Sequence, residues 1–235
     1  MPLPKDCELR ISFDRAEVST SLLQITDGEE LEELKINDCF AVTEWVSSPS
    51  LRSFFQEIEN NPVAYNYDEI EMLTKPLPMG EKIIRLDNIR GGNIPSYIFL
   101  GIIPTGAVTG DFKQSSTNFE CNKVTELNIT LNGYSVNGYP INIRNESGTN
   151  VLFQFNETVG RTYNLRCGSG ITRGKFPSNF IWAHRFEAEE TFQGWIGVDM
   201  KLSEELSTSH TMIIWLISPM TVTIDKYHQV TRVTE

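Results

Sequence analysis

The chain of 235 residues carries 31 acidic and 20 basic residues, giving a formal net charge of -11, and 40% of its residues are hydrophobic. This composition excludes a disordered or fibrous chain, and the shortage of Lys and Arg argues against direct nucleic-acid binding. No apolar run reaches the ~18 residues that span a membrane, so no membrane insertion is expected. Because MPLPKDCELR is not a signal peptide, we expect a soluble protein that is not secreted.

The first half of the chain contains predicted strands and short helices. ELRISFD, from Glu8 to Asp14, alternates apolar and polar residues as a half-buried strand does, and DGEELEEL (27–34) predicts a short surface helix. SLRSFFQEIENNP (50–62) places apolar residues at helical spacing, with Ser50 as a candidate N-cap. In AYNYDEIEML (64–73) the apolar positions change from odd to even numbers, which predicts a bulge near Asp68.

The second half is predicted to be mostly strand. YIFLGII (97–103) does not alternate, which indicates a central strand covered on both faces. NVLFQFNETVG predicts a helix from an Asn150 cap to a stop at Gly160. Three further segments alternate with period two, which predicts antiparallel strands with one wet face: VTELNITLNG (124–133), WIGVDMKL (195–202) and TVTID (221–225).

This layout lacks the alternation of strands and helices that doubly wound folds require. It predicts an all-β fold, an antiparallel jelly-roll sandwich of about eight strands with two or three short helices in the connections. No internal repeat or linker is visible, so residues 1–235 are expected to form a single jelly-roll domain.

No catalytic, cofactor-binding or metal-binding residue is predicted. His184, His210 and His228 stand apart from one another, and the loop Gly168–Gly174 lacks the strand and helix that frame a phosphate site. The acidic stretch at 27–34 lacks the ligand spacing of a calcium loop. Cys7, Cys39, Cys121 and Cys167 are widely spaced, which indicates free thiols rather than a zinc site or a disulfide framework.

The segment from Asp87 to Pro140 resembles the second jelly roll of double-jelly-roll major capsid proteins, such as those of Polinton/Maverick-type elements, virophages and related DNA viruses. The resemblance lies in NIRGGNIPSYIFLGIIPTGAVTG (88–110), the pair Asn118-Phe119, and ELNITLNGYSVNGYPI (126–141). NVLFQFNETVG is similar to the short helix of that family, and MIIWLISPMTVTIDKYHQVTR (212–232) to its final strands. Thr117 replaces a family proline, residues 29–60 hold more helical sequence than expected, and only one jelly roll is present.

The resemblance implies a non-enzymatic capsid protein, located in the virion, that self-associates, most simply as a homotrimer, and contacts other capsid proteins. The chain is then either the C-terminal half of a double-jelly-roll capsid protein or a single-jelly-roll relative such as a vertex protein. The loops 111–121 and 167–179 are expected to project or to contact neighbours. Gly106 and Gly110 are expected to allow the turn after the central strand.

Two alternatives remain at this point. One is a carbohydrate-binding jelly roll that uses exposed Tyr and Trp side chains, with Trp45, Trp182, Trp195 and Trp215 as candidates. The other is a jelly-roll enzyme, either metal-dependent or a glycosidase that uses carboxylates within His184–Glu190. Jelly rolls host all three functions, so the fold by itself does not separate them.

Overall fold

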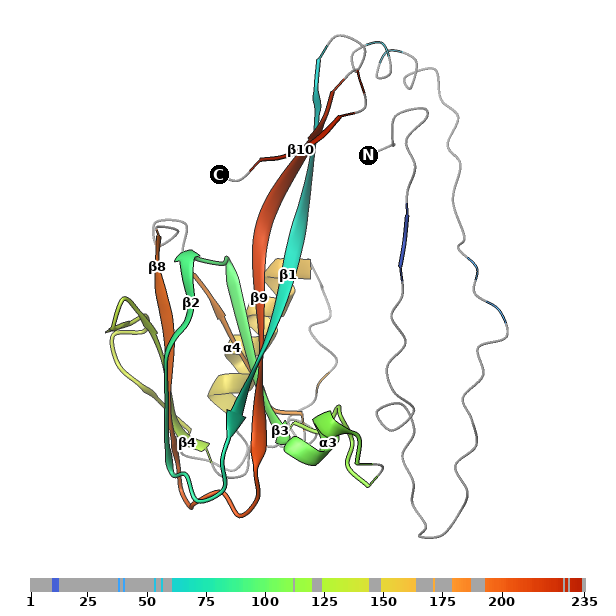
Figure 1. The fold of residues 1–235 in the computed structure, drawn as a ribbon. Helices are drawn as coiled ribbons and strands as arrows, with labels where there is room; N and C mark the ends of the chain where they lie inside the picture. Colours follow the sequence, from blue (N-terminus) through green and yellow to red (C-terminus); the bar gives the residue numbers. More distant parts are fainter. Residues whose placement is uncertain are drawn as a thin grey trace. The chain divides into compact units, whose positions relative to one another are not determined.

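The structure, a computed structural model (Figure 1), describes residues 10–12, 38, 40, 53, 56, 61–111, 113–119, 124–143, 149–163, 171, 179–186, 193–225, 227 and 229–233. The chain divides into two compact units. One comprises Glu17–Glu29 and Ile70–Ser218 and is called the sandwich below; the other comprises Met1–Ala16, Glu30–Glu69 and Pro219–Glu235, and its described strands are called the ribbon.

Two antiparallel sheets hold ten described strands. The first sheet has the order β1-β9-β3-β7, with β10 paired to β9, and the second has the order β2-β8-β4-β5, with β6 paired to β4. The strands are β1 (Val63–Leu77), β2 (Ile83–Asn93), β3 (Tyr97–Pro104), β4 (Val124–Leu131), β5 (Tyr134–Ser135), β6 (Ile141–Asn142), β7 (Ile181–Arg185), β8 (Gln193–Leu202), β9 (His210–Ile224) and β10 (Val230–Val233). The described helices include α3 (Thr105–Thr109) and α4 (Thr149–Tyr163).

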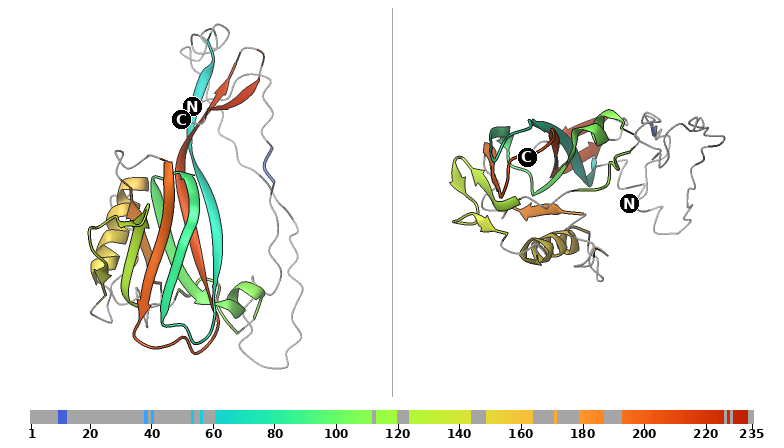
Figure 2. Two further views of the ribbon diagram at one scale, coloured as in Figure 1. Left: turned by 60° about the vertical axis from the view of Figure 1, so that its left-hand side comes forward. Right: turned by 90° about the horizontal axis from the view of Figure 1, so that it is seen from below.

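The strand pairings nest inside one another. β4 pairs with β5 and β6, β3 pairs with β7, β2 pairs with β8, and β1 lies beside β9. From β1 to β4 the chain also changes sheet at every strand, so the two arms of one long hairpin are rolled into a two-layer sandwich (Figure 2). This is the jelly-roll arrangement, and the predicted all-β fold class is confirmed.

The core lies between the two sheets. Ile98 and Leu100 from β3 point into it, and they meet Ile129 from β4 and Val198 from β8. All four side chains are at most 2% exposed, and burying one such side chain stabilises a fold by about 1.5–3 kcal/mol.

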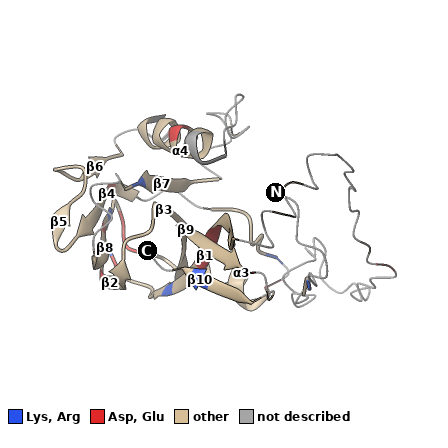
Figure 3. Ribbon diagram, turned by 90° about the horizontal axis from the view of Figure 1, so that it is seen from above, with Lys and Arg blue, Asp and Glu red and all other residues tan. Residues whose placement is uncertain are grey.

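The other face of the first sheet is covered by α4. Phe155 on this helix meets Phe99 on β3, with ring centroids 6.3 Å apart and the rings edge to face. Val159, Ala183 and Ile217 complete a second buried cluster there, and Figure 3 shows α4 beside β7, on the side away from β4 and β8. β3 is therefore covered on both faces, as its unbroken apolar run predicted.

The predicted change of face in β1 is wrong. The half-buried or buried positions stay on odd numbers through Glu69 and Leu73 to Leu77, while Ile70 and Met72 lie on the outward face and are 59% and 61% exposed. The prediction failed because it assumed that every apolar residue of the strand faces the core.

Two other predicted details are corrected. β4 has no wet face at its centre, because Asn128 and Thr130 are buried and the Ser135 hydroxyl donates to Asn128 Oδ1 at 2.5 Å. The helix α4 runs from Thr149 through Gly160 to Tyr163, so Gly160 does not stop it. Asn150 lies inside the helix, and its Nδ2 donates to the carbonyl oxygen of Asn142 at 3.1 Å.

Several predictions fall wholly or partly outside the described residues. The helix at 27–34 and all four cysteines lie there, and Ser53 and Gln56, described within 50–62, are helical and exposed. Within the predicted strand Glu8–Asp14, the described residues 10–12 are exposed and not in a strand, which contradicts the prediction at those positions. No helix in the described part of the chain is long and apolar enough to cross a membrane.

The ribbon is a three-stranded antiparallel sheet. It consists of residues 63–69 of β1, residues 219–224 of β9, and β10. β10 pairs with β9 in a register that places Val230 opposite Ile224 and Arg232 opposite Val222. The turn before β10 is held by Asp225, whose Oδ1 accepts hydrogen bonds from the backbone N–H groups of Tyr227 and Gln229 at 2.9 and 2.8 Å.

Candidate functional site

The corner after β3 is tightly built. α3 begins directly after Pro104 and ends at Gly110, whose φ of 94° lies in the left-handed region that favours glycine. A Cβ on Gly106 would lie 2.8 Å from Oε1 of Gln114, so the following loop packs closely against α3. Both glycines therefore serve the turn that the sequence predicted for them.

The loop after this corner is anchored to the first sheet by Phe119. The Phe119 ring fills the space above Gly101, where a Cβ would lie 2.5 Å from the ring, and it meets Trp215 edge to face at 5.7 Å. The backbone carbonyl of Phe119 also accepts a hydrogen bond from the N–H of Phe180 at 3.1 Å. The described end of the predicted projecting loop 111–121 is thus part of the packed structure. Of the second predicted loop, 167–179, only Ile171 and Asn179 are described.

The described tryptophans do not form a platform. Trp182 is fully buried in the core, and Trp215 is half-buried against Phe119. Trp195 is 36% exposed, but its ring lies 3.5 Å from the position of a Cβ on Gly133, over the turn that follows β4. The carbohydrate alternative is therefore wrong in assigning Trp182 to an exposed surface, and Trp45 lies outside the described residues.

His184 is a core residue. Its ring stacks on Trp182 at a centroid distance of 5.8 Å and meets Phe186 edge to face at 5.0 Å. Burial removes water from the imidazole and lowers the pKa of His184 from its ordinary 6.5 to about 4. His184 Nε2 and Trp182 Nε1 are buried without a hydrogen-bond partner, so at neutral pH His184 is uncharged and packs as an aromatic side chain.

The described residues bring no metal-binding constellation together. Among them there is no group of three or more His, Cys, Asp and Glu side chains that would hold an ion. His210 is buried at the start of β9, where its Nδ1 lies 2.8 Å from the carbonyl oxygen of Thr208. His228 and Glu187–Glu190 lie outside the described residues, as does Gly168–Gly174 except for Ile171.

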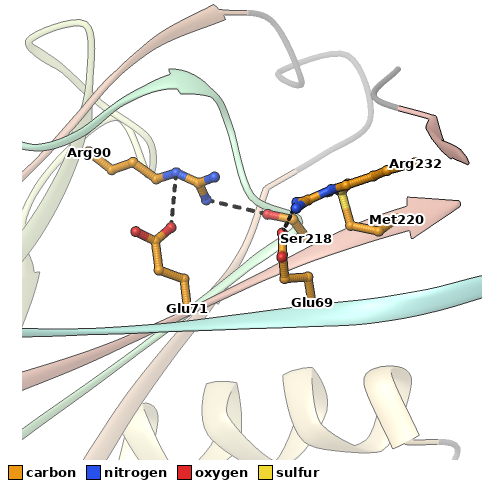
Figure 4. A network of polar contacts seen from close by, with 6 residues as sticks. All are labelled: Glu69, Glu71, Arg90, Ser218, Met220 and Arg232. Atoms are coloured by element: carbon orange, nitrogen blue, oxygen red, sulfur yellow. Dashed lines mark hydrogen bonds and ion pairs between the residues drawn. The ribbon is translucent and has the colours of Figure 1, made fainter. Parts of the chain in front are cut away.

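An arginine joins the two sheets at one edge of the sandwich. Arg90 follows an irregularity in β2 between Leu86 and Arg90, and its Nε lies 3.3 Å from Oε2 of Glu71 on β1. Its Nη1 donates to the hydroxyl of Ser218 on β9 at 3.4 Å (Figure 4). Because the side chains of Arg90 and Glu71 are 25% and 44% exposed, water screens this pair and its contribution to stability is at most about 1 kcal/mol.

Several large apolar side chains on the strands of the sandwich are exposed. Ile70 and Met72 lie on the outward face of β1, an edge strand, and Tyr134 and Tyr139, which are 81% and 72% exposed, lie at β5 and just before β6. Apolar and aromatic residues on exposed strands are typical of protein contact surfaces. These side chains are therefore candidates for contacts with another protein.

Comparison with known proteins gives the following matches. No family model matches the chain. In sequence, 102 residues are 29% identical to the Caenorhabditis elegans protein F54H12.2, which is described as uncharacterized; the match covers 43% of this chain and 24% of that protein.

In structure, the chain is similar to several viral proteins. One is a chain of the Sputnik virophage, with 14% identity and a TM-score of 0.45, and the match covers 73% of this chain and 39% of that one. Another is the mavirus major capsid protein, with 11% identity and a TM-score of 0.41, and the match covers 80% of this chain and 44% of that one. PBCV-1 VP54, fitted into a reconstruction of Sputnik, matches at 9% identity and a TM-score of 0.48, covering 80% of this chain and 55% of that one. Our chain spans between two fifths and just over half of the length of these three chains.

Proposed function

We propose that this chain is a non-enzymatic capsid protein, a jelly roll that self-associates into symmetric capsomers of an icosahedral shell. The observation that carries the proposal is that the segment resembling the capsid family folds as one continuous structural unit. Its apolar run is the central strand β3, its glycine turn is the corner around α3, and its Asn118-Phe119 pair places Phe119 on Gly101. Each quoted motif therefore has a structural role in the jelly roll.

The second quoted segment supports the same proposal. ELNITLNG forms β4 and then turns back at Asn132 and Gly133, whose φ values are 52° and 84°. The Asn132 side-chain oxygen accepts a hydrogen bond from the N–H of Trp195 on β8 at 2.9 Å, and the turn is thereby tied to the neighbouring strand. At Gly101 and Gly133 the missing side chain leaves room for the rings of Phe119 and Trp195.

The proposal includes the place of the chain in a larger protein. We infer that residues 1–235 act as one jelly-roll domain, the C-terminal half of a double-jelly-roll capsid protein, because residues 87–140 resemble the second jelly roll of that family. The expected partners are further copies, most simply as a homotrimer, and other capsid proteins. The protein is expected in the virion, without direct contact to nucleic acid, consistent with its net charge of -11.

The test is the mass of the purified chain in solution, measured by light scattering after gel filtration, with negative-stain images of the same peak. A trimer with ring-like views is the expected result. A five-fold ring would indicate a vertex role instead. A chain that remains monomeric at the highest concentration reached would contradict self-association.

A further inference from the structure

The two faces of the ribbon differ sharply in chemistry. The Arg232 guanidinium lies 2.5 Å from Oε2 of Glu69 and 3.9 Å from Sδ of Met220, so these three side chains share one face (Figure 4). Because side chains alternate along a strand, the same face carries every second residue of each strand. These residues are Val63, Tyr65 and Tyr67 on β1, Val222 and Ile224 on β9, and Val230 on β10.

The opposite face of the ribbon is polar. The Thr221 hydroxyl donates to Asn66 Oδ1 at 2.9 Å, and the Thr223 hydroxyl donates to the carbonyl oxygen of Thr231 at 3.4 Å. The alternation places Asp68 on this face as well. The ribbon is therefore an amphipathic sheet, with an apolar face and a face that water can solvate.

The apolar face is only partly covered. Val63 and Ile224 are 8% and 7% exposed, but Tyr67 is 42% exposed and Val230 is 65% exposed. A three-stranded sheet gains its stability by burying a hydrophobic face, so the open part of this face is costly to leave in water. Its tyrosines, its methionine and its arginine are residue types that are enriched where proteins meet.

The charges on this face indicate what covers it. Glu69 and Arg232 are the charged residues that the described strands place there, and they are paired with each other, so the face is neutral although the whole chain carries a net charge of -11. A charged partner would find no unpaired charge to bind, and two copies that met through most other surfaces would repel each other. A second copy offers the same neutral apolar face, which suits a two-fold symmetric contact.

From these observations we infer that the apolar face of the ribbon, defined by Val63, Tyr65, Tyr67, Met220, Val222, Ile224 and Val230, binds the same face of a second copy of this chain. The inference rests on the proposed function, because it names one surface through which the capsid protein associates. It adds the partner, the face and the symmetry of that contact: a two-fold contact pairs copies, so it would join one capsomer to another and is separate from the contacts that close a homotrimer.

The experiment compares two adjacent positions on opposite faces of β10. Val230→Glu places a charge on the apolar face, and Thr231→Glu places the same charge on the polar face of the same exposed strand. Association is measured by sedimentation over a range of concentrations, and circular dichroism establishes that both variants keep the β-fold. We expect Val230→Glu to weaken the pairing of capsomers at least tenfold and Thr231→Glu to change it less than twofold, while neither variant alters the homotrimer itself.

The outcomes distinguish a failure of the proposed ribbon contact from a failure of the proposed self-association. If the wild-type chain associates and Val230→Glu associates equally well, the ribbon face is not the contact, while the proposed self-association stands. If both variants weaken association equally, added negative charge alone explains the result and the face is not specific. If the wild-type chain remains monomeric, both the surface and the self-association are wrong.

Discussion

The two halves of β9 lie in contrasting environments. In the sandwich, Met212, Ile214 and Leu216 are fully buried on one face, and Ile217 is 3% exposed on the other. In the ribbon, Met220 and Val222 are only half-buried. The same alternating chemistry therefore gives a closed core where a second layer covers it and an open face where no described layer does. We infer that the first half provides stability and the second half provides a surface for association.

The largest effect is expected from a substitution in the buried part of β9, within the sandwich. Ile214→Ala removes a fully buried core side chain and is expected to lower the free energy of unfolding by about 2–5 kcal/mol, because a cavity remains. Denaturation with urea, followed by circular dichroism, measures it. Val222→Ala on the same strand is the matched variant, with an expected loss below about 1 kcal/mol. Equal losses at the two positions would contradict the contrast between the halves.

The second prediction concerns how the free energy of unfolding depends on pH through His184, a residue buried in the sandwich. The folded pKa of His184 lies near 4 and its unfolded pKa near 6.5, so the unfolded chain binds the proton more strongly. The free energy of unfolding should therefore be highest above pH 6.5 and fall by about 3 kcal/mol between pH 6.5 and pH 4. Urea denaturation at pH 7, 5.5 and 4.5 measures this fall.

The control for this prediction is His184→Leu, which removes the titrating group from the core. The variant should lose less stability than the wild type over the same pH range, since the other ionisable groups are unchanged. Parallel pH profiles in the two proteins would show that His184 is not buried in its neutral form.

A third prediction concerns the contact between Gly101 and Phe119. Gly101→Ala places a methyl group where the ring now lies, 2.5 Å from Phe119 Cδ1, and is expected to cost about 1–3 kcal/mol. Gly91→Ala on the edge strand β2 is the control, because its Cβ would meet only ordinary contacts at 3.5 Å and beyond. Thermal unfolding of both variants measures the difference. A Gly101→Ala protein as stable as the wild type would mean that Phe119 does not occupy this position.

The smallest expected effects come from the surface ion pairs of the two units. Glu71→Gln removes the pair with Arg90 in the sandwich, and Glu69→Gln removes the pair with Arg232 in the ribbon. Each should change the free energy of unfolding by less than about 1 kcal/mol, because both pairs are partly exposed. Urea denaturation at low and high salt measures them. A loss above 2 kcal/mol for either variant would show that its pair is buried in solution.

Sequence reasoning was most successful where a pattern has a single physical interpretation. The unbroken apolar run of β3 required cover on both faces, and the core and α4 supply it. The alternation in β8 also placed Ile196 and Val198 correctly on the core side. In both cases apolar residues are buried as their spacing demands.

It failed where exposure depends on distant parts of the chain. Ile70 and Met72 are apolar but face outward, and Asn128 is polar but buried, because what covers a strand is decided by tertiary packing. The burial of Trp182 could not be predicted either, since the spacing of a single tryptophan does not show which side of the sheet it faces. The alternation that produces the apolar face of the ribbon is visible in the sequence, because TVTID and VAYNY alternate with the same period. Their pairing could not be predicted, because it links residues about 150 positions apart.

The nested pairing of the strands also has a consequence for the order in which the strand pairs form during folding. The turn at Asn132 and Gly133 brings β4 and β5 together at the cost of closing a very short loop, whereas β1 must wait for β9, the strand beside it, which begins more than 130 residues later. Loop-closure entropy therefore favours folding from the inside of the nest outwards, with the β1–β9 pair formed last. During synthesis, the face that we infer to bind a second copy would exist only once β9 and β10 have left the ribosome, so unfinished chains would lack it.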